Sequence, residues 1–102
     1  NNKILVKRVI ASEGQYISID DDGVVSVNGI VIDEPYVEEL SLGDCNISFP
    51  YQIPEGQYFV MGDHRAVSVD SRKAEIGCIS EEFIVGKLEF CIWPMSDIGQ
   101  IE

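Results

Sequence analysis

Long apolar runs and basic residues are what this sequence lacks. Apolar runs such as Ile4-Leu5-Val6 and Phe59-Val60-Met61 are far shorter than the ~18 residues of a membrane-spanning helix. The 102 residues include 7 Lys and Arg against 18 Asp and Glu, so the formal net charge is −11. Because proteins bind nucleic acids by neutralising phosphates with basic side chains, we expect no nucleic-acid partner. The length fits one domain and excludes two.

Histidine and cysteine are also scarce. The sequence has a single histidine, His64, and three widely spaced cysteines, Cys45, Cys78 and Cys91. A zinc site needs about four convergent ligands, so we predict no metal site and no cofactor. An odd number of cysteines leaves at least one thiol unpaired. The other two are either free or joined in one disulfide, and the sequence leaves both states open.

Helical periodicity is scarce, whereas turn residues are frequent, which indicates short strands joined by turns. We predict a mostly β fold, with antiparallel strands in a small barrel-like or coiled sheet core, a long irregular loop and at most one short helix. Asn28-Gly29 predicts a two-residue hairpin turn, and Ser80-Glu81-Glu82 predicts a helical turn capped by the serine hydroxyl. The expected strands cover residues 3–11, 16–19, 24–27, 30–32, 57–61 and 84–93, with an irregular excursion at 37–56 and a structured or mobile loop at 64–77.

The first expected strand places a lysine beside an arginine. Leu5, Lys7 and Val9 share one face of the strand, and Arg8 lies on the other. If the Leu5 and Val9 face is the core face, burial among aliphatic side chains disfavours the charged form of Lys7. A neutral lysine is a general base that can take a proton from a serine hydroxyl. The alternative is a lysine that extends its ammonium group to water.

A polar stretch follows the apolar strand at 57–61. Gly62 allows a tight backbone turn, and Asp63 can accept hydrogen bonds from loop amides. Asp70 and Arg72 are two residues apart, so on an extended segment they share a side and can pair. These residues either fix a loop or form part of a functional site.

The order of several sequence blocks resembles the type I signal peptidases. The resemblance covers nearly the whole chain, and the segment 62–72 is its most specific part. It implies a membrane-bound serine endopeptidase that removes signal peptides after small residues, with a Ser/Lys dyad on an all-β core of the signal-peptidase type. The matching blocks are Lys7-Arg8-Val9-Ile10, Gly14, Val27-Asn28-Gly29, Glu34-Pro35-Tyr36, the segment 62–72, Ile84-Val85-Gly86-Lys87 and Trp93-Pro94.

The resemblance also implies roles for individual residues. Lys7 matches the general base, and Ser68 matches the serine that orients this lysine. Asp70 and Arg72 match an ion pair that supports the site. Three further residues match supporting positions: Gly62, Asp63 and Arg65.

The sequence departs from the family pattern in two places. Three departures lie at the end of the first strand and in the turn after it. The family usually has Gly at the position of Ala11, Pro or a small residue near Glu13, and Asp at the position of Gln15, so we expect a different turn. His64 replaces the commoner Asn. The family's nucleophile is a serine followed by Met and then, two positions later, usually by Pro, upstream of the lysine.

No serine of this chain has that context. Six residues precede Lys7, and none of them is serine. We therefore expect residues 1–102 to be a single domain, the C-terminal portion of a signal peptidase I catalytic domain, without the nucleophile and the N-terminal membrane anchor. The serines that lack the family's context are Ser12, Ser18, Ser26, Ser41, Ser48, Ser71, Ser80 and Ser96.

For the full-length protein, the resemblance implies signal peptides of secreted preproteins as substrates. It places the protein in the cell membrane, with the catalytic domain on the extracytoplasmic side. Strands of the full-length domain that precede this chain would cover part of its apolar surface. Exposure of that surface predicts self-association of the fragment. Two alternatives remain: a non-catalytic β fragment or interaction module, and another Ser/Lys protease of the LexA-like type, which is not expected to carry the segment 62–72.

Overall fold

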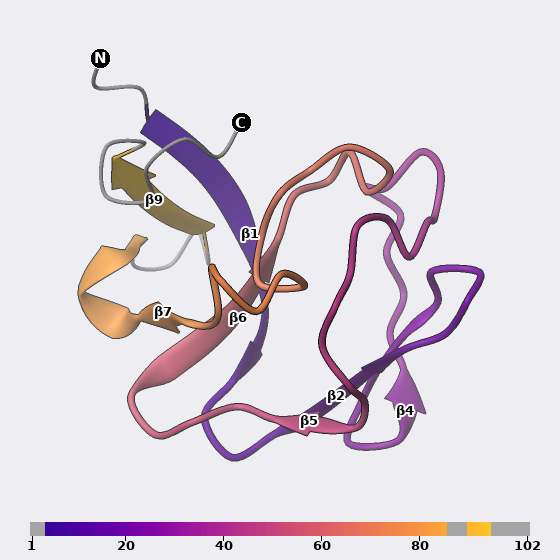
Figure 1. Cartoon of the computed structure of the whole chain (residues 1–102), viewed down its shortest axis with the longest axis horizontal. Helices are drawn as coiled ribbons and strands as arrows, with labels where there is room; N and C mark the ends of the chain where they lie inside the picture. Colours follow the sequence, from indigo (N-terminus) through magenta and orange to yellow (C-terminus); the bar gives the residue numbers. More distant parts are fainter. Residues whose placement is uncertain (1–3, 86–89, 95–102) are drawn as a thin grey trace.

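The computed structural model describes residues 4–85 and 90–94, with side chains described for residues 7–84. They form two antiparallel sheets, one toward each end of the long axis (Figure 1). The larger sheet has the strand order β7-β6-β1-β9-β8, and the smaller has β4-β3-β2-β5. The mostly β prediction is confirmed, and no closed barrel forms within this part of the chain. The elements are β1 (Ile4–Ser12), β2 (Tyr16–Ile19), β3 (Val25–Val27), β4 (Ile30–Val31), β5 (Tyr51–Gln52), β6 (Gln57–Met61), β7 (Ile79–Ser80), a 3₁₀ turn η1 (Glu81–Phe83), β8 (Ile84–Val85) and β9 (Phe90–Pro94).

Strand β1 lies in the middle of the larger sheet and leads into the smaller one (Figure 1). It pairs with β6 on one side and β9 on the other, and its register with β6 shifts between Val9 and Ala11. Such a bulge bends a strand and increases its twist. The turn into β2 is closed by Gln15, whose Oε1 accepts a hydrogen bond from Ser12 N at 2.7 Å. Gln15, a departure from the family pattern, therefore has a local structural role.

Strand β6 is buried on both faces. Phe59 and Met61 belong to the main core, where they join buried residues of the smaller sheet such as Ile17. Val60 belongs to a second cluster with Ile79. Because successive side chains of a strand point to opposite faces, the unbroken apolar run of β6 supplies both cores. Strand β6 ends at Met61, and residue 62 begins the next loop.

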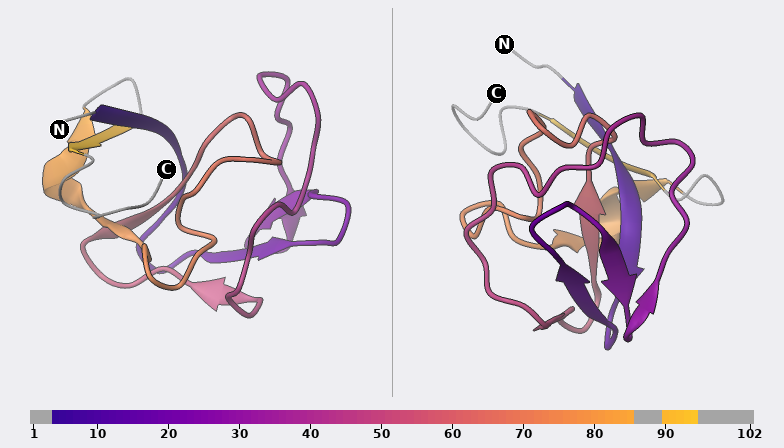
Figure 2. Two further views of the ribbon diagram at one scale, coloured as in Figure 1. Left: turned by 45° about the horizontal axis from the view of Figure 1, so that its top comes forward. Right: turned by 90° about the vertical axis from the view of Figure 1, so that its right-hand side faces the viewer.

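The segment 62–78 folds back against β6 and β1. Ser71 N donates to Val60 O at 3.1 Å, and Val60 N donates to Ser71 Oγ at 3.0 Å. The left view of Figure 2 shows this salmon-to-orange segment running between the two sheets. The structured alternative for this loop is therefore the one observed. Among the described residues, no helix has the length and apolar character to cross a membrane.

Most strand predictions are confirmed to within one residue at each end, but the C-terminal one is wrong. Residues 84–93 were predicted as one strand, whereas Ile84 pairs antiparallel with Cys91, so the chain reverses between β8 and β9. An alternating apolar pattern fits both arms of a hairpin equally well, and it does not reveal the reversal.

The two-residue strand β5 was missed because it is too short to show a period. At the expected hairpin turn, Asn28 and Gly29 have φ angles of 52° and 82°.

The predicted cap of the short helix is also wrong. The helical turn is present as η1, but Ser80 makes no capping hydrogen bond with its side chain. Ser80 is instead the last residue of β7, where it pairs with Gln57. The N–H of Glu81 donates to Gly56 O at 3.2 Å. Strand pairing therefore decides how this turn begins.

Candidate functional site

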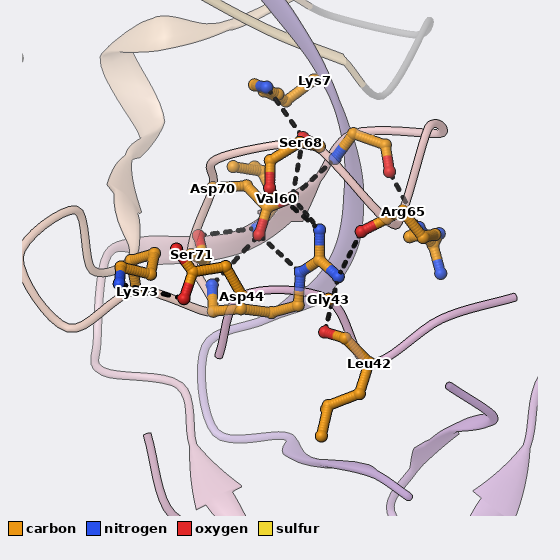
Figure 3. Close-up of polar contacts among 12 residues, drawn as sticks. Lys7, Leu42, Gly43, Asp44, Val60, Arg65, Ser68, Asp70, Ser71 and Lys73 are labelled. Atoms are coloured by element: carbon orange, nitrogen blue, oxygen red, sulfur yellow. Dashed lines mark hydrogen bonds and ion pairs between the residues drawn. The ribbon is translucent and has the colours of Figure 1, made fainter. Parts of the chain in front are cut away.

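Lys7 on β1 meets Ser68 in the loop after β6. Lys7 Nζ donates to Ser68 Oγ at 2.9 Å, although the two residues are 61 positions apart (Figure 3). Both residues are partly buried. Val9, two residues along the same face of β1, packs against the cluster of Val60 and Ile79. The lysine thus lies on the same face of β1 as Val9, as the alternation of side chains along the strand predicted, and its amine donates to a hydroxyl group.

The hydroxyl of Ser68 links this lysine to a carboxylate. Ser68 Oγ donates to Asp70 Oδ2 at 3.0 Å (Figure 3). A hydroxyl has one proton to donate, and an ionised carboxylate can only accept. Because Ser68 gives its proton to Asp70, its oxygen lone pairs are available to Lys7, which has to be the donor. The hydrogen bonds therefore run in one direction, from Lys7 through Ser68 to Asp70.

A buried ion pair holds Asp70 in place. Arg72 Nε donates to Asp70 Oδ1 and Arg72 Nη2 donates to Asp70 Oδ2, both at 2.8 Å, and neither side chain is exposed to solvent. Arg72 Nη1 also donates to Leu42 O at 2.8 Å and to Arg65 O at 3.0 Å. Buried charges are tolerated when they are paired and their remaining hydrogen-bonding groups are satisfied. Both conditions are met here, so the pair is a rigid support.

The carboxylates of Asp70 and Asp63 are ionised at neutral pH. Burial acts to raise the pKa of Asp70, but the hydrogen bonds and charge of Arg72, with the backbone N–H groups of Gly62 and Arg72, outweigh burial and lower the pKa. The hydrogen bond from Arg8 lowers the pKa of Asp63, against a smaller opposing effect of burial. A carboxylate with a lowered pKa stabilises the folded state above its unfolded pKa of about 3.9.

We expect the protein to lose stability in acid partly through these two carboxylates. Their contribution is fully present above about pH 5 and is lost as the pH falls through the lowered folded-state pKa values. Urea unfolding at a series of pH values between about 3 and 7 measures this loss. Asp63→Asn removes one of the two contributions, so its free energy of unfolding should fall less steeply in acid. A wild-type slope in Asp63→Asn would contradict the prediction.

Gly62 leaves room for the contact between Lys7 and Ser68. A Cβ atom at Gly62 would overlap Ser68 Oγ and would lie 3.4 Å from Lys7 Nζ. The backbone N–H of Gly62 donates to Asp70 Oδ2 at 2.9 Å. Gly62 is therefore required for space at this point, as the close approach of side chain to backbone shows.

A second buried ion pair lies behind Gly62. Arg65 is fully buried, and its Nη1 and Nη2 donate to Glu34 Oε1 and Oε2 at 3.1 and 2.7 Å. Arg65 Nε donates to Gly62 O at 2.8 Å. Tyr36 OH also donates to Glu34 Oε2, at 2.7 Å. Burial, the hydrogen bond to Glu34 and its charge raise the pKa of Tyr36 to about 12, so its proton stays in place to donate.

Arg8 joins this second network from β1. Its Nε and Nη2 donate to Asp63 Oδ1 and Oδ2, each at 2.8 Å. Its guanidinium lies 3.6 Å from the ring centroid of Tyr36, a cation–π contact. The residue next to Lys7 is thus attached both to the loop after β6 and to the turn that holds Glu34.

The structure gathers every site residue named from the sequence into these two adjoining networks. Their catalytic and supporting roles remain predictions. The contributions of Glu34 and Tyr36 were missed, since their only signal was the Glu-Pro-Tyr block, and Glu34 lies 31 residues from Arg65. Cys45 and Cys78 are free thiols. Within the described part of the chain, no three His, Cys, Asp or Glu residues are grouped to hold a metal ion.

Comparison with known proteins matches residues 1–93 to a family described as signal peptidase, peptidase S26. Signal peptidase I T of Bacillus subtilis is 36% identical over 102 residues, covering 93% of this chain and 52% of that protein. Signal peptidase IB of Staphylococcus aureus is 38% identical over 112 residues, covering 94% and 56%. The thylakoidal processing peptidase 1 of Arabidopsis thaliana is 37% identical over 99 residues, covering 97% and 27%.

A solved structure agrees with these similarities. The crystal structure of a signal peptidase I from Enterococcus faecalis aligns with a TM-score of 0.57 and 28% sequence identity, covering 74% of each chain. The chain spans about half the length of the two bacterial signal peptidases named in the preceding paragraph.

Proposed function

Because the chain belongs to the signal peptidase family, peptidase S26, we propose that the full-length protein is a membrane-bound serine endopeptidase that cleaves N-terminal signal peptides from exported proteins. The observation that carries the proposal is the 2.9 Å hydrogen bond from Lys7 Nζ to Ser68 Oγ. This hydrogen bond positions the amine of Lys7 next to Ser68, which is bonded in turn to the buried pair of Asp70 and Arg72. Such an amine is in the right surroundings to act as a general base.

The proposed base is Lys7, and the nucleophile is a serine from another part of the full-length protein. In its neutral form Lys7 Nζ has two protons and one lone pair. One N–H donates to Ser68, which leaves the lone pair for the nucleophile's hydroxyl. Lys7 takes that proton as the serine oxygen attacks the carbonyl carbon after a small residue.

The remaining steps follow from proton balance. Backbone amide and hydroxyl donors stabilise the tetrahedral oxyanion. As the peptide C–N bond breaks, Lys7 gives its proton to the leaving amine. The acyl group stays on the serine as an ester, the acyl-enzyme. A water molecule, deprotonated by Lys7, then hydrolyses the ester and regenerates the serine. Ser68, Asp70 and Arg72 act as positioning residues, while Gly62, Asp63 and Arg65 support them.

The substrates in this proposal are signal peptides of secreted preproteins, with small residues before the cleavage site. Residues 1–102 form the C-terminal part of a catalytic domain on the extracytoplasmic side of the cell membrane. Another part of the protein supplies the nucleophile and the membrane anchor. The bacterial relatives, about twice as long as this chain, support that arrangement. Exposed Ile30, Val31 and Val67 are consistent with self-association of the isolated chain, which stays a prediction.

A cleavage assay with two proteins tests this proposal. The full-length protein should cleave a peptide that carries Ala-x-Ala before the scissile bond. The 102-residue chain alone should not, because a general base without a nucleophile cannot begin acyl transfer. Turnover by the isolated chain would show that it contains its own nucleophile. No cleavage of such peptides by the folded full-length protein in detergent would refute the signal-peptidase assignment.

A further inference from the structure

Gly62 is fixed on both of its peptide groups, and each is held by a different buried ion pair. Its N–H donates to Asp70 Oδ2 at 2.9 Å, and Asp70 is paired with Arg72. Its C=O accepts from Arg65 Nε at 2.8 Å, and Arg65 is paired with Glu34. Glycine has more backbone freedom than any other residue. Gly62 lies next to the hydrogen bond between Lys7 and Ser68. We expect the bonds from its N–H to Asp70 and from Arg65 to its C=O to hold it in one conformation.

Backbone hydrogen bonds join the residues that follow Gly62. Arg65 N donates to Asp63 O at 2.9 Å, and Ser68 N donates to His64 O at 3.0 Å. These backbone bonds make 63–68 a compact turn with Ser68 at its end. A rotation about the backbone of Gly62 would therefore displace Ser68 relative to Lys7, because β1 and β6 are paired only as far as Arg8 and Met61.

The buried pair of Glu34 and Arg65 opposes that rotation of Gly62. The Glu34 side chain is only 4% exposed and that of Arg65 is 0% exposed. Both Glu34 oxygens accept from Arg65, which fixes the orientation of the planar Arg65 guanidinium with its Nε directed at Gly62 O. Two parallel hydrogen bonds fix orientation as well as distance.

The turn that carries Glu34 also holds the lysine strand. Tyr36 donates to Glu34, and its ring contacts the guanidinium of Arg8, the neighbour of Lys7. One short turn after β4 therefore contacts Arg8, the neighbour of Lys7 on β1, and Arg65, in the loop that carries Ser68.

We propose that Glu34 is a positioning residue for the candidate catalytic site, acting through Arg65 on the carbonyl of Gly62 and so on the distance between Lys7 and Ser68. The inference rests on the proposed function. It adds a second support beside the pair of Asp70 and Arg72, from a segment about 30 residues distant in sequence. Glu34 touches neither Lys7 nor Ser68 in the contacts described above, so its effect on the reaction is indirect.

The test uses the full-length protein with Glu34→Gln, which keeps the size of the side chain and removes its charge. We expect kcat for an Ala-x-Ala peptide to fall by about 10-fold or more, because small misplacements of catalytic groups are costly. KM should stay within about twofold, since substrate contacts are unchanged. The acid limb of the kcat/KM profile should move to higher pH, because a displaced Lys7 has easier access to water and keeps its proton longer.

A second variant covers the case in which Glu34→Gln does not fold. Tyr36→Phe removes only the hydroxyl that donates to Glu34 and leaves the ring beside Arg8. It should lower kcat by less, with the same direction of change in the pH profile. The double variant Glu34→Gln/Arg65→Gln should lose no more activity than the more affected single variant, since both residues act on the same carbonyl.

Two controls separate positioning from general destabilisation. Ile53→Val loosens the main core at a residue whose backbone bonds the turn of Gly14 and Gln15, and it should lower the melting temperature while kcat and the pH profile stay as in the wild type. Glu38→Gln removes an exposed carboxylate from the same segment and should change neither. Wild-type kcat and pH profile in folded Glu34→Gln, or in Tyr36→Phe if the first does not fold, would overturn the inference while leaving the proposed function intact. Failure of the wild-type enzyme to cleave would instead reject both.

Discussion

Replacing Lys7 with alanine in the full-length protein is expected to lower kcat for signal-peptide cleavage by roughly 10³-fold or more, with little change in KM. Lys7 Nζ is the amine that Ser68 holds at 2.9 Å. Without that amine the proposed serine nucleophile loses the group that takes its proton. Single-turnover cleavage of a peptide with Ala-x-Ala before the scissile bond measures the effect on the chemical step.

A second substitution separates the charge of the lysine from its ability to lose a proton. Lys7→Arg keeps a positive charge and can still donate to Ser68, but a guanidinium stays protonated at any pH at which the protein works. We expect Lys7→Arg to be about as inactive as Lys7→Ala. Substantial activity in Lys7→Arg would mean that the charge, and not proton transfer, is what the reaction uses.

Lys73 offers a matched control for the loss of a lysine. It forms a surface ion pair with Asp44 at 3.1 Å, and the Asp44 side chain is 66% exposed. Surface pairs of this kind contribute about 1 kcal/mol or less, so Lys73→Ala should keep activity within about twofold. Cleavage by Lys7→Ala at the rate of Lys73→Ala would refute the assignment of the base.

Arg72→Met is expected to destabilise the protein by about 3–5 kcal/mol, because it leaves the Asp70 carboxylate charged and buried without its partner. Domains of this size are stable by only about 5–15 kcal/mol in total. Three carbonyl groups that Arg72 contacts at 3.3 Å or less also lose a donor: Leu42 O, Arg65 O and Ser68 O. Urea unfolding followed by circular dichroism measures the change in the free energy of unfolding.

The same substitution at an exposed pair is the control for Arg72. Arg8 is paired with Asp63 at 2.8 Å, but their side chains are 25% and 42% exposed, so water screens the charges. Arg8→Met also removes the cation–π contact with Tyr36, and should therefore cost about 1–2 kcal/mol in total. Arg72→Lys keeps the charge but not the two parallel hydrogen bonds, and should fall between the two. Equal losses for Arg72→Met and Arg8→Met would contradict the view that burial makes the inner pair the main support.

Elements with a local sequence signal could be predicted. The Asn28-Gly29 turn needs positive φ angles at both residues, and few residue types other than these two tolerate them, so the hairpin is visible in the sequence. The apolar run Phe59-Val60-Met61 helped to identify β6 correctly. The hairpin of β8 and β9 was not predicted, because alternation of apolar residues continues through both arms. Strand β5 was missed because pairing with β2, not its own two residues, makes it a strand.

The candidate site shows the same division. Spacing suggested that Asp70 and Arg72 could pair, and the pair is present at 2.8 Å. Nothing local joined Lys7 to Ser68, and the two could be placed in one site only because the order of blocks resembled a known family. The partner of Arg65 could not be foreseen at all. Of the 18 acidic residues, any could have been its partner by charge alone.

The sequence by itself determined the class of the fold, the family and the residue types available for proton transfer, because composition, alternation and motif order are properties of the chain. The tertiary structure decided which charges are buried and which groups donate to which. Those outcomes depend on strands β1 and β6 meeting and on the loop at 62–78 folding back over them. Burial then turns ordinary ion pairs such as Asp70 with Arg72, and Glu34 with Arg65, into fixed supports for Lys7 and Ser68. In water the same charges would be screened and would hold nothing in place.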